Sequence, residues 1–252
     1  PLDTDAGKEI QDEWMRFYKR VLETLISSLK IRFPIKTGEN EKIYEKAIKA
    51  RAFDIARGFL PAGATTYASW HTNLRQAYDH LKEMRNHPLE EVKETAREIM
   101  KSLQTKYSSS FLHKEYPIEE EYIKKSVGEF TYFDDPTIKN FSYQVRLDID
   151  GLKKHQSLLT DRPAKAELHN RFRQYGDIIF SFLLDFGSYR DLQRQRSSIQ
   201  EMPLLSIGHG FHPWYLEQLT PDLRKEAEII LKNQEQKIAN LQTEAIIKQY
   251  YT

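Results

Sequence analysis

Three arginines, Arg190, Arg194 and Arg196, fall close together after an apolar segment and could bind an anion. We expect one short helix to carry all three, with the first two on one face because they are four positions apart. Like charges at this spacing repel, and a phosphate would neutralise them through bidentate bonds to the guanidinium groups. The alternative is a solvated helix whose arginines pair with the neighbouring carboxylates of Asp185, Asp191 and Glu201.

A second group of polar residues surrounds a Leu-Pro break in the first third of the chain. Arg57 precedes the break, and the helix expected after it carries Asn73, Arg75 and Arg85. An asparagine amide can both donate to and accept from the edge of a heterocycle, and arginines supply positive charge. The alternative is that these residues are ordinary polar side chains on the surface of amphipathic helices.

Other chemistries are poorly supported. His209 and His212 form an H-x-x-H pair, but no third ligand recurs at a suitable spacing, so we expect no metal site. The chain contains no cysteine, which excludes disulfides, thiolate metal sites and a cysteine nucleophile. The phosphate loop G-x-x-x-x-G-K-[ST], the dinucleotide motif G-x-G-x-x-G and the G-x-S-x-G elbow are also missing.

Hydrophobic periodicity predicts the elements that must position these residues. Apolar residues at helical spacing predict helices over residues 10–29, from 42 to Leu60, from a cap at Thr65 or Thr66 to about 86, over 89–103, and from Pro221 onward. Alternating or continuous apolar segments predict strands at 129–134, 140–148 and 177–185. The expected fold class is therefore α+β, mostly helical with a small antiparallel sheet.

Composition limits the partners. The 252 residues carry a net charge of +1, so the chain is not a general nucleic-acid binder, and its arginines matter only where they cluster. Charged residues make up 30% of the chain, which is usual for a globular protein. No apolar run approaches the roughly 18 residues that a membrane span needs. We therefore expect a cytoplasmic protein without membrane contact, and the absence of cysteine agrees with a reducing compartment.

Two segments resemble the flavin-dependent thymidylate synthases. Residues 56–61 (ARGFLP) and 73–75 (NLR) are similar to the second half of that family, where A-R-x-x-L-P precedes an N-x-R helix that ends in an essential arginine. Residues 194–201 (RQRSSIQE) resemble the family signature R-H-R-x-x-S-x-N-E, and an apolar strand leads into them as in the family.

The resemblance implies a reaction and a set of roles. The family converts dUMP to dTMP with FAD as hydride carrier, NADPH as reductant and methylenetetrahydrofolate as carbon donor. The implied substrate-binding residues are Arg57, Gln193, Arg194 and Arg85, and Arg85 is also the implied catalytic residue, stabilising the ionised uracil. The implied FAD-binding residues are Asn73, Arg75, Arg194, Gln195, Arg196 and Glu201.

The chain departs from the family in its signature. Gln195 replaces the central histidine, the signature is one residue short with Gln200 in place of asparagine, and residues 202–206 (MPLLS) replace S-G-R-Y. These changes leave an alternative open, a non-catalytic nucleotide- or flavin-binding or structural homologue. A helical interaction protein without any nucleotide role is a third interpretation.

The order of the motifs is also reversed. Residues 1–110 resemble the family's C-terminal half and residues 111–252 its N-terminal half. Either the fold is circularly permuted, or the sequence joins halves of two tandem copies; the similar amphipathic character of the first and last helices favours the tandem interpretation. The expected assembly is a homo-oligomer or an intramolecular pseudo-oligomer of tandem copies, because family active sites form between subunits.

Overall fold

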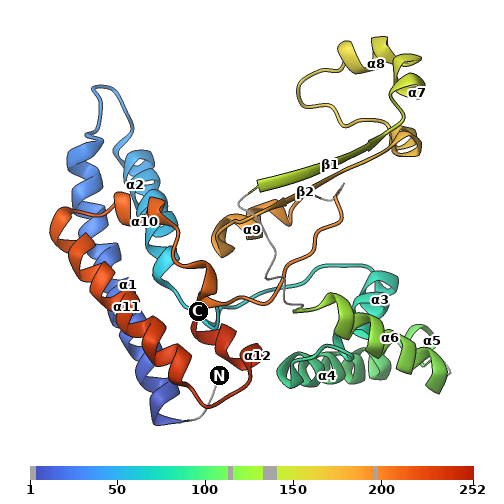
Figure 1. Cartoon of the computed structure of the whole chain (residues 1–252), viewed down its shortest axis with the longest axis horizontal. Helices are drawn as coiled ribbons and strands as arrows, with labels where there is room; N and C mark the ends of the chain where they lie inside the picture. Colours follow the sequence, from blue (N-terminus) through green and yellow to red (C-terminus); the bar gives the residue numbers. More distant parts are fainter. Residues whose placement is uncertain (1–3, 113–115, 133–140, 196–197) are drawn as a thin grey trace. The chain divides into compact units, whose positions relative to one another are not determined.

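A computed structural model describes residues 4–112, 116–132, 141–195 and 198–252 (Figure 1). The chain forms two compact units. The first joins Pro1–Asp134 with Phe186–Thr252, and the second is Asp135–Asp185. Each unit has its own elements, and the α+β class expected from the sequence is confirmed by many helices and one two-stranded antiparallel sheet. The expected division into sequence halves at residue 110 concerns motif origin, and it stays a prediction.

The larger hydrophobic core of the first unit forms around its first helix. The elements packed there are α1 (Asp5–Arg32), α2 (Glu41–Ala56), the 3-10 turn η1 (Arg57–Phe59), α10 (Pro213–Glu217), α11 (Pro221–Asn240) and the C-terminal turn η4 (Gln249–Tyr251). Figure 1 shows α1 between α2 and α11, and α1 contacts both. Thr4 caps α1 by accepting from the Gly7 N–H. The buried stripe of α1 confirms the helix predicted from residues 10–29, and consists of Ile10, Trp14, Phe17, Val21, Leu25 and Leu29.

The second predicted helix is present, and its apolar spacing predicted the buried face in part. Ile48 and Ala56 are buried as that spacing predicts, whereas Ile43 and Phe53, which the same spacing placed in the core, are exposed. Ala52 and Ile55 are buried as well. The buried positions follow one helical stripe on which Ala52 allows close approach to α1. The chain leaves the α conformation at Leu60, as expected for a residue before proline.

The turn η1 is held from two sides. Phe59 is fully buried, with its ring 5.3 Å from that of Phe17 and 5.1 Å from that of Phe211. A Cβ on Gly58 would lie 2.5 Å from the ring of Tyr215, so this position requires glycine for close packing. Because the backbone on either side of it is packed, Arg57 projects from a fixed turn.

A smaller core in the same unit lies between three of its helices, α3 to α5, and a fourth helix, α6, contacts α3. These helices are α3 (Leu74–Met84), α4 (Glu90–Lys106), α5 (Ser108–Phe111) and α6 (Pro117–Phe130). Leu81, Ala96 and Phe111 are among the buried side chains of this core.

The start of α3 corrects a prediction. Neither Thr65 nor Thr66 caps a helix; the chain stays non-helical until Asn73, and Tyr67 and Trp70 are exposed rather than buried. The side-chain oxygen Oδ1 of Asn73 accepts from the Gln76 N–H at 2.9 Å. This cap places the first residue of α3 at Leu74.

The strand predicted at 129–134 is also wrong where it is described. Glu129 and Phe130 form the last turn of α6, which starts with a proline followed by two acidic residues that favour a helix N-terminus. The remainder of that prediction, from residue 133, lies outside the described residues.

The C-terminal residues close against the Leu-Pro break. The Ala62 N–H donates to the Thr252 carbonyl at 2.9 Å, and the Gly63 N–H donates to the Tyr250 carbonyl at 2.9 Å. A Cβ on Gly63 would lie 2.6 Å from that same Tyr250 oxygen, so a larger residue would push the two segments apart. These bonds connect the break after Arg57 to η4 and to Thr252, which follow the short helix α12 (Ala245–Lys248).

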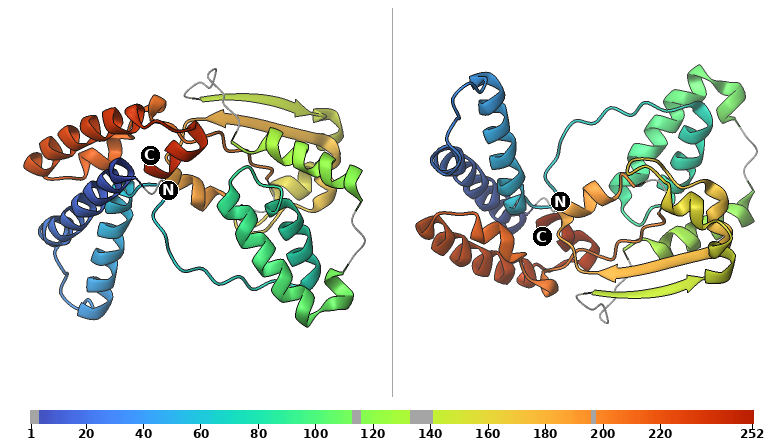
Figure 2. Two further views of the ribbon diagram at one scale, coloured as in Figure 1. Left: turned by 90° about the horizontal axis from the view of Figure 1, so that it is seen from below. Right: turned by 90° about the horizontal axis from the view of Figure 1, so that it is seen from above.

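The second unit is a β-ribbon with short helices at one end. Strands β1 (Phe141–Leu147) and β2 (Gly176–Phe182) pair antiparallel with Tyr143 opposite Phe180, and both views of Figure 2 show them side by side. This confirms the strand at 140–148 and most of the strand at 177–185. The turns that follow β1 and precede β2 are α7 (Ile149–Lys153), α8 (Gln156–Thr160) and η2 (Asn170–Tyr175). None of the helices within the described ranges is both long and apolar enough to cross a membrane.

Candidate functional site

One carboxylate joins the two arginine motifs. Asp191, on the short helix α9 (Phe186–Leu192), places its Oδ2 3.6 Å from Nη2 of Arg57 and its Oδ1 3.5 Å from Nη2 of Arg194. Arg57 belongs to the A-R-x-x-L-P segment and Arg194 to the signature. The two motifs therefore meet within a single chain, despite their reversed order.

Arg57 is the less exposed of the two arginines. Its side chain is 22% exposed, and its Nη1 lies 3.6 Å from the Asp54 carboxylate one turn earlier on α2. Its Nε is buried and has no hydrogen-bond partner among the described residues. The ion pairs at 3.6 Å are longer than a good hydrogen bond, so the guanidinium keeps unused donor capacity. A buried donor without an acceptor lowers the stability of the fold, and an acceptor atom of a bound ligand would remove this cost.

The arginines near residue 190 do not share one helix. Helix α9 ends at Leu192; Arg190 lies on it, but Arg194 lies in the turn that follows and is 76% exposed. Arg196 lies outside the described residues. The prediction of one helix carrying three arginines is therefore wrong for Arg194, because backbone turns replace the helical ladder after Leu192. The predicted pairing of this segment with a neighbouring carboxylate is correct for Asp191.

Gln200 explains how the shortened signature folds back. Its Nε2 donates to the Leu192 carbonyl at 2.9 Å and to Ser198 Oγ at 2.7 Å. These bonds satisfy an end carbonyl of α9 and close the loop that carries the signature. Gln193, Gln195 and Glu201, for which binding roles were expected, are exposed around this loop, and those roles stay predictions.

Asn73 and Arg75 stand at the exposed start of α3. The Asn73 carbonyl oxygen is used by the helix cap, while its amide Nδ2 keeps its donors. Arg75 is exposed in the first turn, and none of the ion pairs formed within the described ranges involves it. A cationic side chain is unfavourable at a helix N-terminus, so Arg75 does not stabilise α3 through its charge.

Arg85 is paired with a carboxylate. Its Nη2 lies 2.5 Å from Oε1 of Glu120 on α6, and both side chains are mostly buried. Asn86 donates to the other oxygen of Glu120 at 3.4 Å and to the Lys82 carbonyl at 3.0 Å. This network joins the end of α3 to α6, whereas Arg57 lies between Ala56 and Phe59 of the larger core. The catalytic role expected for Arg85 stays a prediction.

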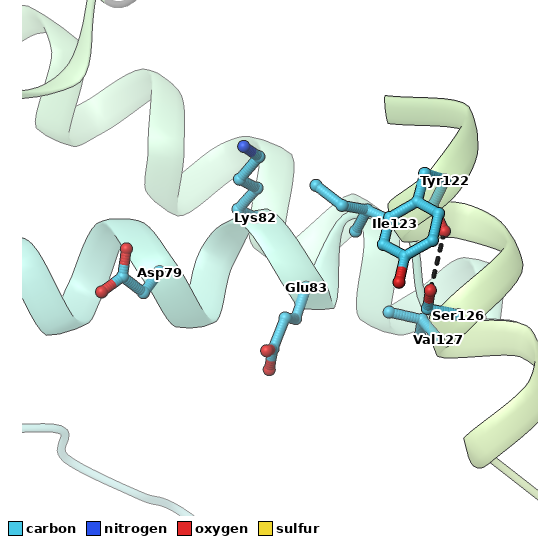
Figure 3. A pocket seen from close by; sticks show the side chains of 7 residues that line it. All are labelled: Asp79, Lys82, Glu83, Tyr122, Ile123, Ser126 and Val127. Atoms are coloured by element: carbon cyan, nitrogen blue, oxygen red, sulfur yellow. Dashed lines mark hydrogen bonds between the residues drawn. The ribbon is translucent and has the colours of Figure 1, made fainter. Parts of the chain in front are cut away.

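A pocket of about 350 Å³ lies between α3 and α6 (Figure 3). It is lined by Asp79, Lys82, Glu83, Tyr122, Ile123, Ser126 and Val127. Lys82 is already paired with Glu119, a contact that raises the lysine pKa. The Asp79 and Glu83 carboxylates make this pocket unfavourable for an anion, because the lysine that lines it is already paired.

Sequence patterns gave no sign of a cluster of titratable groups near the C-terminus. The Tyr250 hydroxyl donates to Glu91 at 2.6 Å, and burial followed by this carboxylate raises the Tyr250 pKa. His87 packs edge-on against Tyr132, and burial lowers the His87 pKa. Tyr132 has φ of 59°, an uncommon backbone conformation for a tyrosine. These contacts join residues that are distant in the sequence, so no local motif predicts them.

The histidine pair of the H-x-x-H segment has a structural explanation. His212 caps α10 by accepting from the Trp214 N–H, and His209 ends a short 3-10 turn. Within the part of the chain that the structure describes, no three histidine or carboxylate side chains gather so that they could hold a metal.

Comparison with known proteins gives one distant relative. A curated "UPF0159 protein" of Chlamydia pneumoniae is 24% identical over 213 residues, an alignment that covers 67% of this chain and 40% of that protein. The chain thus spans well under two thirds of its relative's length. No protein-family model matches the chain, and no solved structure matches it either.

Proposed function

We propose that this chain carries a nucleotide site of the flavin-dependent thymidylate synthase type, acting in the reductive methylation of dUMP to dTMP. The observation that carries the proposal is the meeting of Arg57 and Arg194 at Asp191. Arg194 lies three residues after Asp191, so the contact that brings the two distant segments together is the one between Arg57 and Asp191. It supports the proposal because the two segments resemble separate parts of one family site.

The chemistry of this cluster fits a phosphate monoester. Two guanidinium groups offer forked donors, and Arg57 Nε is an orphaned buried donor. In the proposed site Arg57 and Arg194 bind the dUMP phosphate or ring, and Gln193 from the same turn adds an amide. The larger core fixes Arg57, so little side-chain freedom is lost on binding.

The donors expected to hold FAD fit in kind. Asn73 keeps its amide donors, and Arg75 is exposed and takes part in none of the ion pairs within the described ranges. With the exposed Gln195 and Glu201, and with Arg194 and Arg196 of the signature, they would bind the flavin and its phosphates. FAD would supply the hydride, with NADPH as its reductant and methylenetetrahydrofolate as the carbon donor.

Arg85 would act through its positive charge. A guanidinium beside the uracil ring stabilises the negative charge that develops when the ring ionises. Here Glu120 neutralises that charge at 2.5 Å. The proposed role therefore requires the Arg85–Glu120 pair to open when dUMP binds.

FAD uptake is the test of this proposal. The purified chain is mixed with FAD, and flavin fluorescence is followed during titration, with Arg75→Ala as the binding variant and Arg97→Ala as a matched control on an exposed face of α4. We expect quenching by the native chain and by the control, and weaker quenching by the Arg75 variant. Folded protein that leaves flavin fluorescence unchanged would contradict the proposal.

A non-catalytic homologue is the second candidate, and two observations favour it. The signature histidine is replaced by the exposed Gln195, and Gln200 is occupied in closing the loop rather than in facing a ligand. Such a protein would bind nucleotide or flavin without forming dTMP. Rescue of a thymidine-requiring strain by this chain alone would exclude this candidate.

The tandem interpretation bears on the assembly. The alignment with the Chlamydia relative covers 40% of that protein, and the tandem interpretation expects this chain to be one part of a longer protein. In the proposal, further copies of the motifs, from another chain or from another part of the same one, complete the site as a homo-oligomer or pseudo-oligomer. The third interpretation, a helical interaction protein, requires that Arg57→Ala and Arg194→Ala change no ligand binding.

A further inference from the structure

We infer that Asp191 is the residue that sets anion affinity at the proposed site, because its carboxylate stands where the ligand phosphate binds. The inference rests on the phosphate site of the proposed function. Each oxygen of Asp191 faces a different guanidinium, Oδ2 toward Arg57 and Oδ1 toward Arg194. A phosphate that bridges the same two arginines must take this position, so binding exchanges one anion for the other.

The charges of the cluster require such an exchange. Arg57 and Arg194 contribute two positive charges, and Asp54 and Asp191 contribute two negative charges. A dianionic phosphate monoester that entered this neutral group would remain uncompensated and would face two carboxylates. Once Asp191 turns away, the two arginines are available to the phosphate.

Asp191 is also the carboxylate that can leave. It is 54% exposed, and both of its arginine contacts are 3.5 Å or longer, so its replacement by water is easy. Asp54 lies one helical turn before Arg57 and stays beside it whatever the ligand. The carboxylate that bridges the two motifs is therefore the mobile competitor, and Asp54 is a fixed neighbour.

The orphaned nitrogen of Arg57 shows what the carboxylate fails to supply. Both oxygens of Asp191 are directed at Nη2 atoms, and Arg57 Nε is left without a partner in the described structure. A carboxylate has two oxygens, whereas a phosphate monoester has three terminal oxygens. The third oxygen gives a phosphate an acceptor for Nε, and this difference favours phosphate over a carboxylate ligand.

The test measures binding of inorganic phosphate to the whole chain by isothermal titration calorimetry. Asp191→Asn removes the charge and keeps the shape, and Asp150→Asn is the control, because Asp150 is an exposed carboxylate paired with Lys153 in the second unit. We expect Asp191→Asn to bind phosphate about tenfold more tightly than the native chain. The control should bind as the native chain does. Adding Arg57→Ala to Asp191→Asn should abolish the gain.

Unchanged or weaker phosphate binding by Asp191→Asn, or a gain that survives loss of Arg57, would overturn the inference. Circular dichroism checks that each variant is folded, and Asp191→Ala replaces Asp191→Asn if the latter does not fold. FAD uptake by the native chain is measured in parallel. Uptake of FAD with no phosphate gain overturns only the role of Asp191, whereas a phosphate gain without FAD uptake contradicts the flavin function and leaves the role of Asp191 standing.

Discussion

Arg57 and Arg85 are equally buried arginines at helix ends, and they differ in how their charge is satisfied. Arg57 has two carboxylates at 3.6 Å and a buried nitrogen without a partner. Arg85 lies 2.5 Å from the Glu120 carboxylate, which also accepts from Asn86. Two arginines of equal burial therefore differ in the length of their ion pairs and in whether a buried nitrogen lacks a partner.

This comparison separates a loosely compensated site from a closed ion pair. A guanidinium with unused donors in a fixed turn can bind a new anion at small cost, whereas opening the Arg85–Glu120 pair exposes two partly buried charges. We therefore expect substitutions around Arg57 to change binding with little loss of stability, and substitutions around Arg85 to change stability in addition to its proposed role.

The largest effect is expected where the core holds Arg57. Phe59→Ala removes a fully buried ring beside Phe17 and Phe211, and should lower the free energy of unfolding by about 3–5 kcal/mol. Phe53→Ala, at an exposed position of the same helical segment, should cost under about 1 kcal/mol. Urea denaturation measures both. Equal losses would show that η1 is not fixed by the core.

Removing the Glu120 partner of Arg85 should lower the free energy of unfolding less than Phe59→Ala does. Glu120→Ala leaves a mostly buried guanidinium without its carboxylate and should destabilise the chain by about 1–2 kcal/mol. Asp191→Ala, which removes only long and exposed contacts, should change stability by under about 0.5 kcal/mol. Thermal or urea denaturation of the two variants compares them directly. A larger loss of stability for Asp191→Ala than for Glu120→Ala would show that Arg57, and not Arg85, forms the stronger ion pair.

Asn73 separates helix capping from ligand binding within one side chain. Asn73→Ala should cost about 1 kcal/mol, because the Gln76 N–H loses its acceptor. Asn73→Ser keeps a capping oxygen but lacks the amide donor, so it should retain most of the stability and bind FAD more weakly. If Asn73→Ser takes up FAD as well as the native chain does, the cap is the whole role of Asn73.

The sequence predicted the parts of the fold that local periodicity controls. The apolar stripe from Ile10 to Leu29 identified α1, and alternating apolar residues identified β1. The start of α3 was predicted too early because Tyr67 and Trp70 continue the helical spacing, although they lie in an extended segment before the Asn73 cap. Near Phe130, aromatic residues indicated a strand, but the proline and acidic start of α6 carry the helix through Glu129.

The site was only partly predictable for a related reason. Motif spacing selected Arg57 and Arg194, whose side chains can bind phosphate, and Asp191 was recognised only as one of several nearby carboxylates. Its bridge to Arg57 joins residues that are distant in the sequence, and the Glu120 partner of Arg85 comes from another helix. Pairings of this kind depend on tertiary packing, so spacing within one segment cannot specify them.

The most direct test of the account is a calorimetric titration of dUMP into three proteins: the native chain, Arg57→Ala and Arg51→Ala. Arg51 is an exposed arginine on the same helix, which stacks on Phe33, and it serves as the matched control. We predict that native chain and control bind dUMP alike, and that Arg57→Ala binds at least about tenfold more weakly while remaining folded. Equal binding by Arg57→Ala, or no binding by the native chain, would contradict the assignment of Arg57 and Arg194 as a phosphate site.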